Sequence, residues 1–194
     1  MGSTYENLIV LDTSTDAVIA MLGPTPALVA PEVGGAVVVF YDEDDAMPGT
    51  VAAALASALD RTVVGFAVFD DDVLGVSVFR GEEYVAEVSV PDAATFFGEG
   101  APELEGMDEM AAELGWPVAA ASGAEAVVAA IGTGDAEAAL ASLQGDFVFA
   151  TERHRALLEA LGLPTFAASW GYRYLTHPGS DEFDGPALVR HLAG

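Results

Sequence analysis

The chain lacks both cysteine and lysine, and each absence restricts what it can do. Without cysteine it forms no disulfides, has no thiolate nucleophile and builds no cysteine-ligated zinc or iron–sulfur site. Without lysine, six arginines oppose 31 acidic residues, and the formal net charge is -25 at pH 7. A field of that sign repels phosphate backbones and anionic lipid headgroups. We therefore expect neither nucleic-acid binding nor attachment to a membrane surface.

Two further absences concern targeting. The first residues, MGSTYENLIVLDTSTD, have no basic segment ahead of an apolar run, so they do not resemble a secretory signal peptide. No apolar run reaches the roughly 18 residues that a transmembrane helix needs. A length of 194 residues with 52% hydrophobic content is sufficient for a packed core. We expect a cytoplasmic protein in which residues 1–194 form a single domain.

The charge is unevenly distributed along the chain. From Arg153 onward arginines and acids balance, and all three histidines lie in this stretch. The residues concerned are Arg153, Arg155, Arg173 and Arg190, Glu159, Asp181, Glu182 and Asp184, and His154, His177 and His191. The chain thus has an anionic body and a neutral C-terminal part. A salt-rich cytoplasm and a GC-rich genome both explain this composition, and the sequence does not separate them.

The first half of the sequence alternates between strand and helix patterns. Thr13-Ser14-Thr15-Asp16 has the spacing of a capping box and opens a short helix, and Pro48 begins a second helix. Strands are predicted over 6–11, 26–30, 36–41 and 62–69, followed by a hairpin of 73–80 and 83–90. This order predicts an α+β fold with a ferredoxin-like βαββαβ sheet, extended by the antiparallel hairpin.

The second half of the sequence is mostly helical in pattern. Helices are predicted over 104–114, 122–132, 135–143 and 147–161, the second of them opened by a capping-box spacing in Ser122-Gly123-Ala124-Glu125. Gly162-Leu163-Pro164 ends the last helix. Residues 165–175 then return as a C-terminal strand. We expect the two halves to share one core.

Two acidic turns are candidate metal sites, because clustered carboxylates are the ligands that Mg²⁺ and Ca²⁺ require. They follow the third and fourth strands and contain Asp42, Asp44 and Asp45, and Asp70, Asp71 and Asp72. In the predicted topology both turns leave the same edge of the sheet, about 10 Å apart. Neither matches an EF-hand loop. Solvated acidic loops are the alternative interpretation.

The helix over 147–161 carries the next candidates. His154 lies within its apolar stripe, between Arg153 and Arg155 and two residues after Glu152. A histidine between two guanidinium groups could bind a carboxylate or phosphate, or transfer protons near neutral pH. The alternative is a histidine at the edge of the core that bonds a backbone carbonyl, with Glu152 and Glu159 each forming an ordinary helix ion pair with Arg155.

Aromatic residues alternate with small ones after this helix. If 165–175 is a strand, Phe166, Trp170, Tyr172 and Tyr174 share one face, with Arg173 on the other. Exposed, that face is a binding platform of residue types that dominate interfaces, and buried, it is core. Ser169, His154 and His177 do not have the pattern of a catalytic triad, and the chain has no phosphate-binding loop or dinucleotide fingerprint.

Several segments together resemble a family of uncharacterised bacterial proteins. They are Asp70-Asp71-Asp72-Val73-Leu74, Phe149-Ala150-Thr151-Glu152-Arg153-His154-Arg155, Ala160-Leu161-Gly162-Leu163-Pro164 and Gly171-Tyr172-Arg173-Tyr174. The sequence departs from that family at Gly75 and Val76, where the family has aromatic residues. The resemblance implies one intact domain, brings no established activity, and draws attention to Glu152, Arg153, His154, Tyr172 and Tyr174.

We expect a non-catalytic protein-binding or regulatory module without a cofactor, whose acidic surface favours a basic protein partner. The alternative is a small-molecule enzyme, or one dependent on Mg²⁺ or Ca²⁺, that uses the acidic turns and His154. A third interpretation is a self-associating structural protein that buries the C-terminal strand in a dimer.

Overall fold

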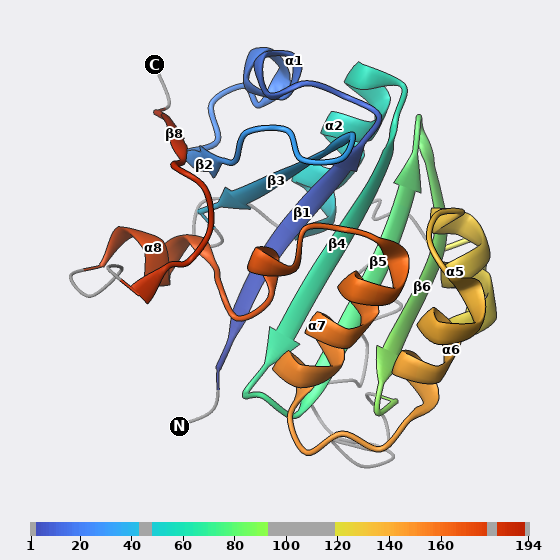
Figure 1. Ribbon diagram of the computed structural model, residues 1–194. Coiled ribbons are helices and arrows are strands. Elements are labelled where there is room, and N and C mark those ends of the chain that lie inside the picture. The colour runs from blue at the N-terminus through green and yellow to red at the C-terminus, as the bar shows by residue number, and fades with distance from the viewer. Residues whose placement is uncertain (1–2, 43–47, 93–118, 178–181, 193–194) are drawn as a thin grey trace, which may run out of the picture.

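The computed structural model describes residues 3–42, 48–92, 119–177 and 182–192. In these residues eight strands form one sheet in the order β7-β6-β5-β4-β1-β3-β2-β8 (Figure 1). The strands are β1 (Tyr5–Leu11), β2 (Ala27–Val29), β3 (Ala36–Tyr41), β4 (Thr62–Phe69), β5 (Val73–Arg80), β6 (Glu83–Val90), β7 (Ala121–Ser122) and β8 (Val189–His191). The helices are α1 (Thr15–Met21), α2 (Pro48–Leu59), α5 (Ala124–Ile131), α6 (Ala136–Gln144), α7 (Ala150–Leu161) and α8 (Tyr172–Thr176), with the 3-10 helix η1 (Thr165–Ala167). Within the described ranges no helix is long and apolar enough to cross a bilayer.

The fold is mixed α+β, and its sheet is larger than the sequence predicts. β1 lies at its centre and pairs antiparallel with β3 on one side and β4 on the other, so β3 and β4 run parallel to each other. β4, β5 and β6 form an antiparallel meander. Two short strands complete the edges, because β7 pairs parallel with β6 and β8 pairs antiparallel with β2. The strands predicted over 36–41, 62–69, 73–80 and 83–90 are confirmed.

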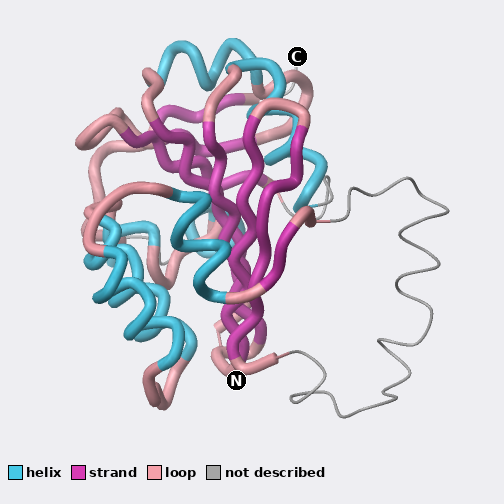
Figure 2. Tube along the Cα trace, turned by 90° about the vertical axis from the view of Figure 1, so that its right-hand side faces the viewer, coloured by secondary structure: helices cyan, strands magenta, loops and turns pink. Residues whose placement is uncertain are grey.

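Alternating side chains give the sheet two packed faces. On β1, Tyr5 and Ile9 belong to one buried cluster, and Leu8 and Val10 belong to the other. The first cluster includes residues of α5, α6 and α7, which define the α7 face, and the second includes residues of α1 and α2, which define the α2 face. Figure 2 shows the strands as a layer between helices.

The turn between β4 and β5 consists of Asp70, Asp71 and Asp72. Phe69 and Val73 pair across it, and the amide of Asp72 donates to the carbonyl of Phe69 at 3.0 Å. Asp70 and Asp71 have φ values of 49° and 64°, in the left-handed region. Aspartate enters this region more readily than most residues, and two such residues in succession match the twist of a tight hairpin. The backbone alone therefore favours aspartate here.

Helix starts agree only partly with the predicted capping boxes. Ser14 caps α1, accepting from the amide of Ala17 at 3.3 Å. The prediction for Ser122 is wrong, because that residue belongs to β7 and α5 begins after Gly123 without a side-chain cap. Asp135 caps α6 through two amides of its first turn, at 3.0 and 3.1 Å.

The predicted returning strand over 165–175 is wrong. These residues form η1 and α8, and Ser169 between them has a φ of 75°, which interrupts any extended run. The carbonyls of Ala167 and Trp170 accept from the side-chain amide of the buried Asn7 at 2.9 and 3.0 Å, and not from the backbone of a neighbouring strand. The last strand of the sheet is β8 instead. The helix predicted over 104–114 lies outside the described residues.

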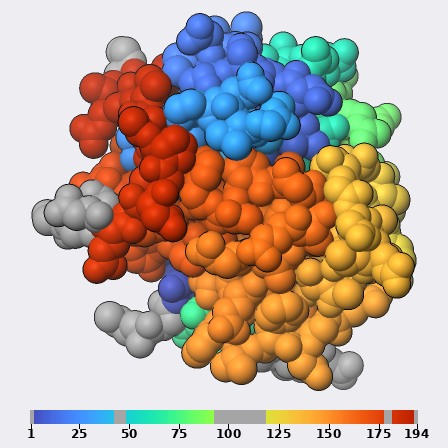
Figure 3. Space-filling view, in the orientation of Figure 1, coloured from blue at the N-terminus to red at the C-terminus, as the bar shows by residue number. Residues whose placement is uncertain are grey.

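The aromatic residues of this stretch therefore do not share one face. Phe166 and Trp170 pack edge-on against Phe183, with ring centroids 6.0 and 5.4 Å apart. Phe40 of β3 lies 6.1 Å from the same ring. Through Phe183, residues 182–192 are held on the α7 face as they run toward β2 (red in Figure 3).

Two glycines near the end of α7 allow a matched test of how closely the chain at Gly134 packs against this helix end. Gly134 and Gly162 have φ values of 73° and 67°, but a Cβ at Gly134 would lie 2.4 Å from the carbonyl oxygen of Ala160, whereas one at Gly162 meets nothing within 4 Å. Gly162→Ala should cost about 1–2 kcal/mol of unfolding free energy through backbone strain alone. Gly134→Ala should cost roughly 3 kcal/mol or more, because overpacking against a rigid backbone adds to that strain. Urea unfolding of both variants measures the difference, and equal losses would contradict it.

Candidate functional site

Asp71 joins the acidic β4–β5 turn to the start of α7. Its carbonyl accepts from the amide of Ala150 at 2.8 Å, and its carboxylate accepts from the amide of Thr151 at 3.1 Å. A carboxylate at a helix N-terminus satisfies unpaired amides and interacts favourably with the helix dipole. One carboxylate of the predicted metal turn is thus a helix cap, and two of the predicted site groups meet here.

The N-terminal segment and α8 reach the same place. The amide of Thr4 donates to the hydroxyl of Tyr174 at 3.4 Å, and the hydroxyl of Thr4 accepts from the amide of Asp70 at 2.9 Å. The amide of Asp71 donates to the carbonyl of Ser3 at 2.8 Å. Tyr174, the acidic turn and the first turn of α7 are therefore connected by short links at one end of the sheet.

This end of the molecule exposes apolar and acidic side chains together. Of the eight exposed large hydrophobic residues in the described part of the chain, four lie here, with exposed fractions of 41% to 77%. We call the set the acidic end surface: Phe69, Val148, Phe149 and Tyr174, with the exposed acids Asp70, Asp72, Asp146 and Glu152. Glu152, Tyr174 and the acidic turn were sequence candidates, whereas Phe69, Val148 and Phe149 carry no local signal that separates them from core residues.

Arg153 faces the interior. It is 8% exposed, and its guanidinium donates to the carbonyls of Leu143 and Ser142 at 2.6 and 3.3 Å, at the end of α6. The same group lies over the ring of Phe147, 5.1 Å from the centroid. The cation therefore closes α6 and ties it to α7, which is a structural role.

His154 of α7 is completely buried against Tyr5 of β1 and Phe66 of β4. Its Nδ1 lies 2.9 Å from the hydroxyl of Tyr5, and its ring stacks on Phe66 with centroids 4.4 Å apart. One hydrogen is shared between the Tyr5 oxygen and Nδ1, and which atom donates it depends on the tautomer of the ring, whose other nitrogen is Nε2. That Nε2 has no hydrogen-bond partner among the described residues.

The charge state of His154 follows from this position. Burial, assisted by the nearby charge of Arg155, lowers the pKa of His154 to about 3. Burial likewise raises the pKa of the Tyr5 hydroxyl. The imidazole is thus neutral at physiological pH and has no surface on which to meet a substrate. His154 therefore lies inside the core and not at its edge, with the Tyr5 hydroxyl as its partner.

The other predicted site residues are dispersed. Arg155 and Glu152 are exposed on α7 and line a shallow groove of about 350 Å³ with Ser169. Tyr172 is half-buried and Arg173 is exposed on α8, while Trp170 packs on Phe183. Asp42 is half-buried at the end of β3, and Asp44 and Asp45 lie outside the described residues. Among the residues that are described, no group of three acidic or histidine side chains could hold a metal ion.

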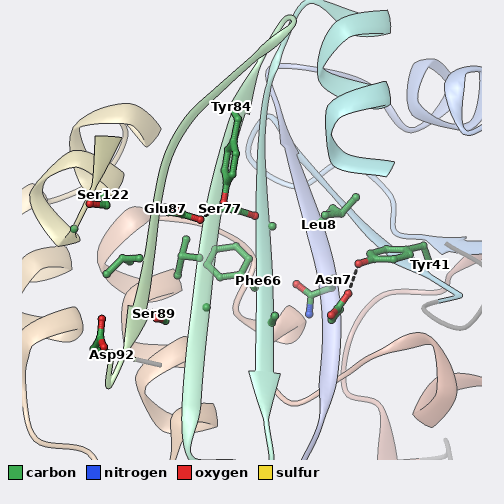
Figure 4. A pocket seen from close by; sticks show the side chains of 17 residues that line it. Asn7, Leu8, Tyr41, Phe66, Ser77, Tyr84, Glu87, Ser89, Asp92 and Ser122 are labelled. Atoms are coloured by element: carbon green, nitrogen blue, oxygen red, sulfur yellow. Dashed lines mark hydrogen bonds between the residues drawn. The ribbon is translucent and has the colours of Figure 1, made fainter. Parts of the chain in front are cut away.

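A cavity lies on the α2 face, beside the part that α2 covers (Figure 4). We call it the sheet-face pocket, and its volume is about 750 Å³, within the range of small-molecule sites. Its floor consists of small residues on β4, β5 and β6, namely Gly65, Ala67, Gly75, Ser77 and Ser89. Two glycines inside predicted strands were the only sequence signal for it.

Two tyrosine–glutamate pairs stand at opposite sides of the sheet-face pocket. Tyr41 donates to Glu6 on the β1–β3 side, and Tyr84 donates to Glu87 at 2.6 Å on β6. Burial raises the pKa of Glu6, and the Tyr41 hydrogen bond opposes that shift. Burial and the neighbouring Glu87 raise the pKa of Tyr84. Each tyrosine hydroxyl thus donates to a glutamate side chain at one side of the pocket.

Comparisons with protein-family models, with curated proteins and with solved structures gave no match. The resemblance to uncharacterised bacterial proteins therefore stays a prediction, and the arguments that follow depend on the geometry of this chain alone.

The role of Arg153 can be separated from that of its neighbour Arg155. Arg153→Met should lower the unfolding free energy by about 1–3 kcal/mol, because the carbonyls that end α6 lose their buried donor. Arg155→Met changes the net charge equally at an exposed position and should stay within about 0.5 kcal/mol of the native value. Chemical denaturation of both proteins compares them. Equal losses would mean that charge, not the α6 contact, is what matters.

Replacing His154 should reduce the acid sensitivity of the fold. The pKa of His154 is about 3 when folded and 6.5 ordinarily, so below pH 6.5 the unfolded chain takes up a proton that the folded chain does not. The stability of the native sequence should fall relative to His154→Leu by about 1.4 kcal/mol per pH unit in that window, and the difference should be constant above it. Denaturation of both proteins across the window cancels the shared carboxylates. Parallel curves would contradict the expected charge state.

Proposed function

We propose that the protein is a non-catalytic binding module that recognises a basic protein partner through the acidic end surface. The observation that carries this proposal is the grouping of Phe69, Val148, Phe149 and Tyr174 among exposed carboxylates. Apolar and aromatic side chains provide most of the binding energy of an interface when water is excluded from them. Surrounding charges select the partner and speed its approach.

The use of the arginines supports a basic partner. Arg61 donates to the carbonyls of Asp12 and Asp60 at 2.8 and 2.9 Å, Arg80 to that of Ala130 at 2.6 Å, and Arg153 to those that end α6. Three of the six arginines thus bind backbone oxygens. Six arginines against 31 acidic residues leave a strongly anionic field, from which a complementary basic surface gains.

The enzyme alternative has less support. It assigns acid–base chemistry to His154, whose ring is inaccessible in this conformation, and metal binding to a turn whose Asp71 caps α7. The acidic end surface presents hydrophobic area instead, which is a property of docking sites.

Photo-crosslinking tests the proposal directly. A photoreactive residue at Val148 should capture one salt-sensitive partner from a lysate of the source cells, and the same residue at Met21 should not, since α1 lies at the other end of the sheet (Figure 1). With that partner purified, Phe149→Ala should weaken binding about tenfold or more. Met21→Ala removes a comparably exposed side chain and should leave affinity unchanged. Equal effects of the two substitutions would refute the assignment of the surface.

Three finer statements about the chain belong to the same proposal. We propose that β1 to β4 with α1 and α2 form a ferredoxin-like unit, which the order β4-β1-β3-β2 supports. We propose that residues 1–194 form one domain, which is supported by one sheet that draws strands from both the first and the last described segments. A cytoplasmic location agrees with the cysteine-free composition.

A further inference from the structure

The sheet-face pocket has a regular construction that the acidic end surface does not use. Its side chains stand in two rows set by strand register. One row runs Glu6–Ala67–Gly75–Ser89 and the next runs Leu8–Gly65–Ser77–Glu87. Each row begins on β1 and ends on β6, so the pocket crosses four strands. Glu6 and Glu87 therefore lie at opposite ends of a floor that is otherwise small or apolar.

The floor is kept flat by glycine. A Cβ at Gly65 would lie 2.5 Å from the hydroxyl oxygen of Ser77. The Ser77 side chain can therefore occupy this place only because residue 65 has no side chain. At Gly75 the nearest atoms to a Cβ belong to Ala67, at 3.7 and 3.8 Å, which is ordinary contact. The floor thus offers backbone and short side chains over which an extended ligand can lie.

The pocket carries two glutamates, Glu6 and Glu87, and no cationic side chain in its described lining. Every arginine and histidine of the chain lies in the described residues, and none of them lines the pocket. Each tyrosine hydroxyl occupies one acceptor position of its glutamate, and a carboxylate has about four. The remaining positions can accept from a cationic ligand.

We propose that the sheet-face pocket binds a linear aliphatic polyamine. One ammonium group is bound by Glu6 beside Tyr41, a second by Glu87 beside Tyr84, and the methylene chain lies across Ala67 and Gly75. Three strand spacings, about 14 Å, separate β1 and β6, the strands that carry the two glutamates. A ligand with ammonium groups at the two ends of a flexible chain fits that separation, whereas a single metal ion does not span it.

Titration calorimetry with spermidine tests this site in the intact protein at about 150 mM salt, where loose counterion attraction is screened. We expect one saturable site, with binding about tenfold or more tighter than that of butylamine. Glu6→Gln with Glu87→Gln should weaken spermidine binding at least about tenfold. Glu82→Gln with Glu83→Gln changes the net charge equally at exposed positions outside the pocket and should alter affinity less than about twofold.

A third variant separates the floor from the charges. Gly75→Val adds a side chain to the floor, keeps every carboxylate, and should abolish binding. Circular dichroism and thermal unfolding confirm that each variant is folded, and glutamine at position 6 still accepts from Tyr41. Equal weakening by the two glutamine pairs, or no saturable binding, would overturn the proposal. Tighter binding of a lysine-rich peptide than of spermidine would overturn it in favour of a protein ligand.

Discussion

The hydrogen bonds between Asp71 and the first turn of α7 determine how the helical part of the chain lies on the sheet. They fix the start of α7 at the β4–β5 turn, so the helical period brings His154 onto Tyr5 and Phe66 one turn later. Arg153 points to the end of α6 for the same reason. The same contact leaves Val148 and Phe149 outside the helix and exposed. One aspartate thus positions both the buried histidine and the surface proposed to bind a partner.

Three arginines of this protein donate hydrogen bonds to backbone carbonyl oxygens. Arg61, Arg80 and Arg153 donate to carbonyls at or next to the C-terminal ends of α2, α5 and α6. Those oxygens have no partner within their helix, and a positive charge at this end of a helix also interacts favourably with the helix dipole. Each arginine so placed stabilises a helix end and is less available to neutralise acidic side chains. None of these three arginines lines the sheet-face pocket.

The local sequence pattern predicts elements that are stabilised by local interactions or are fully buried. It fails for segments whose conformation is set by a contact with residues far away in the sequence. The apolar runs over 36–41 and 62–69 are central strands, and the helix predicted over 147–161 is α7, which begins only at Ala150. The stretch 165–175 alternates like a strand, but Phe183 and Asn7 hold it in other conformations, and neither is a sequence neighbour. The strands β7 and β8 have two and three residues, so only their partners define them. Likewise, the triple aspartate is visible in the sequence, whereas its bond to Thr151 spans 80 positions.

The pairing of β8 with β2 has a consequence for synthesis on the ribosome. β2 carries residues 27–29 and its outer neighbour carries residues 189–191, so one edge of the sheet stays open until nearly the whole described chain has been translated. An open strand edge is a template for pairing with other chains. Contacts this distant in sequence also form slowly. The outer edge of β2 therefore stays unpaired during most of the elongation of this chain.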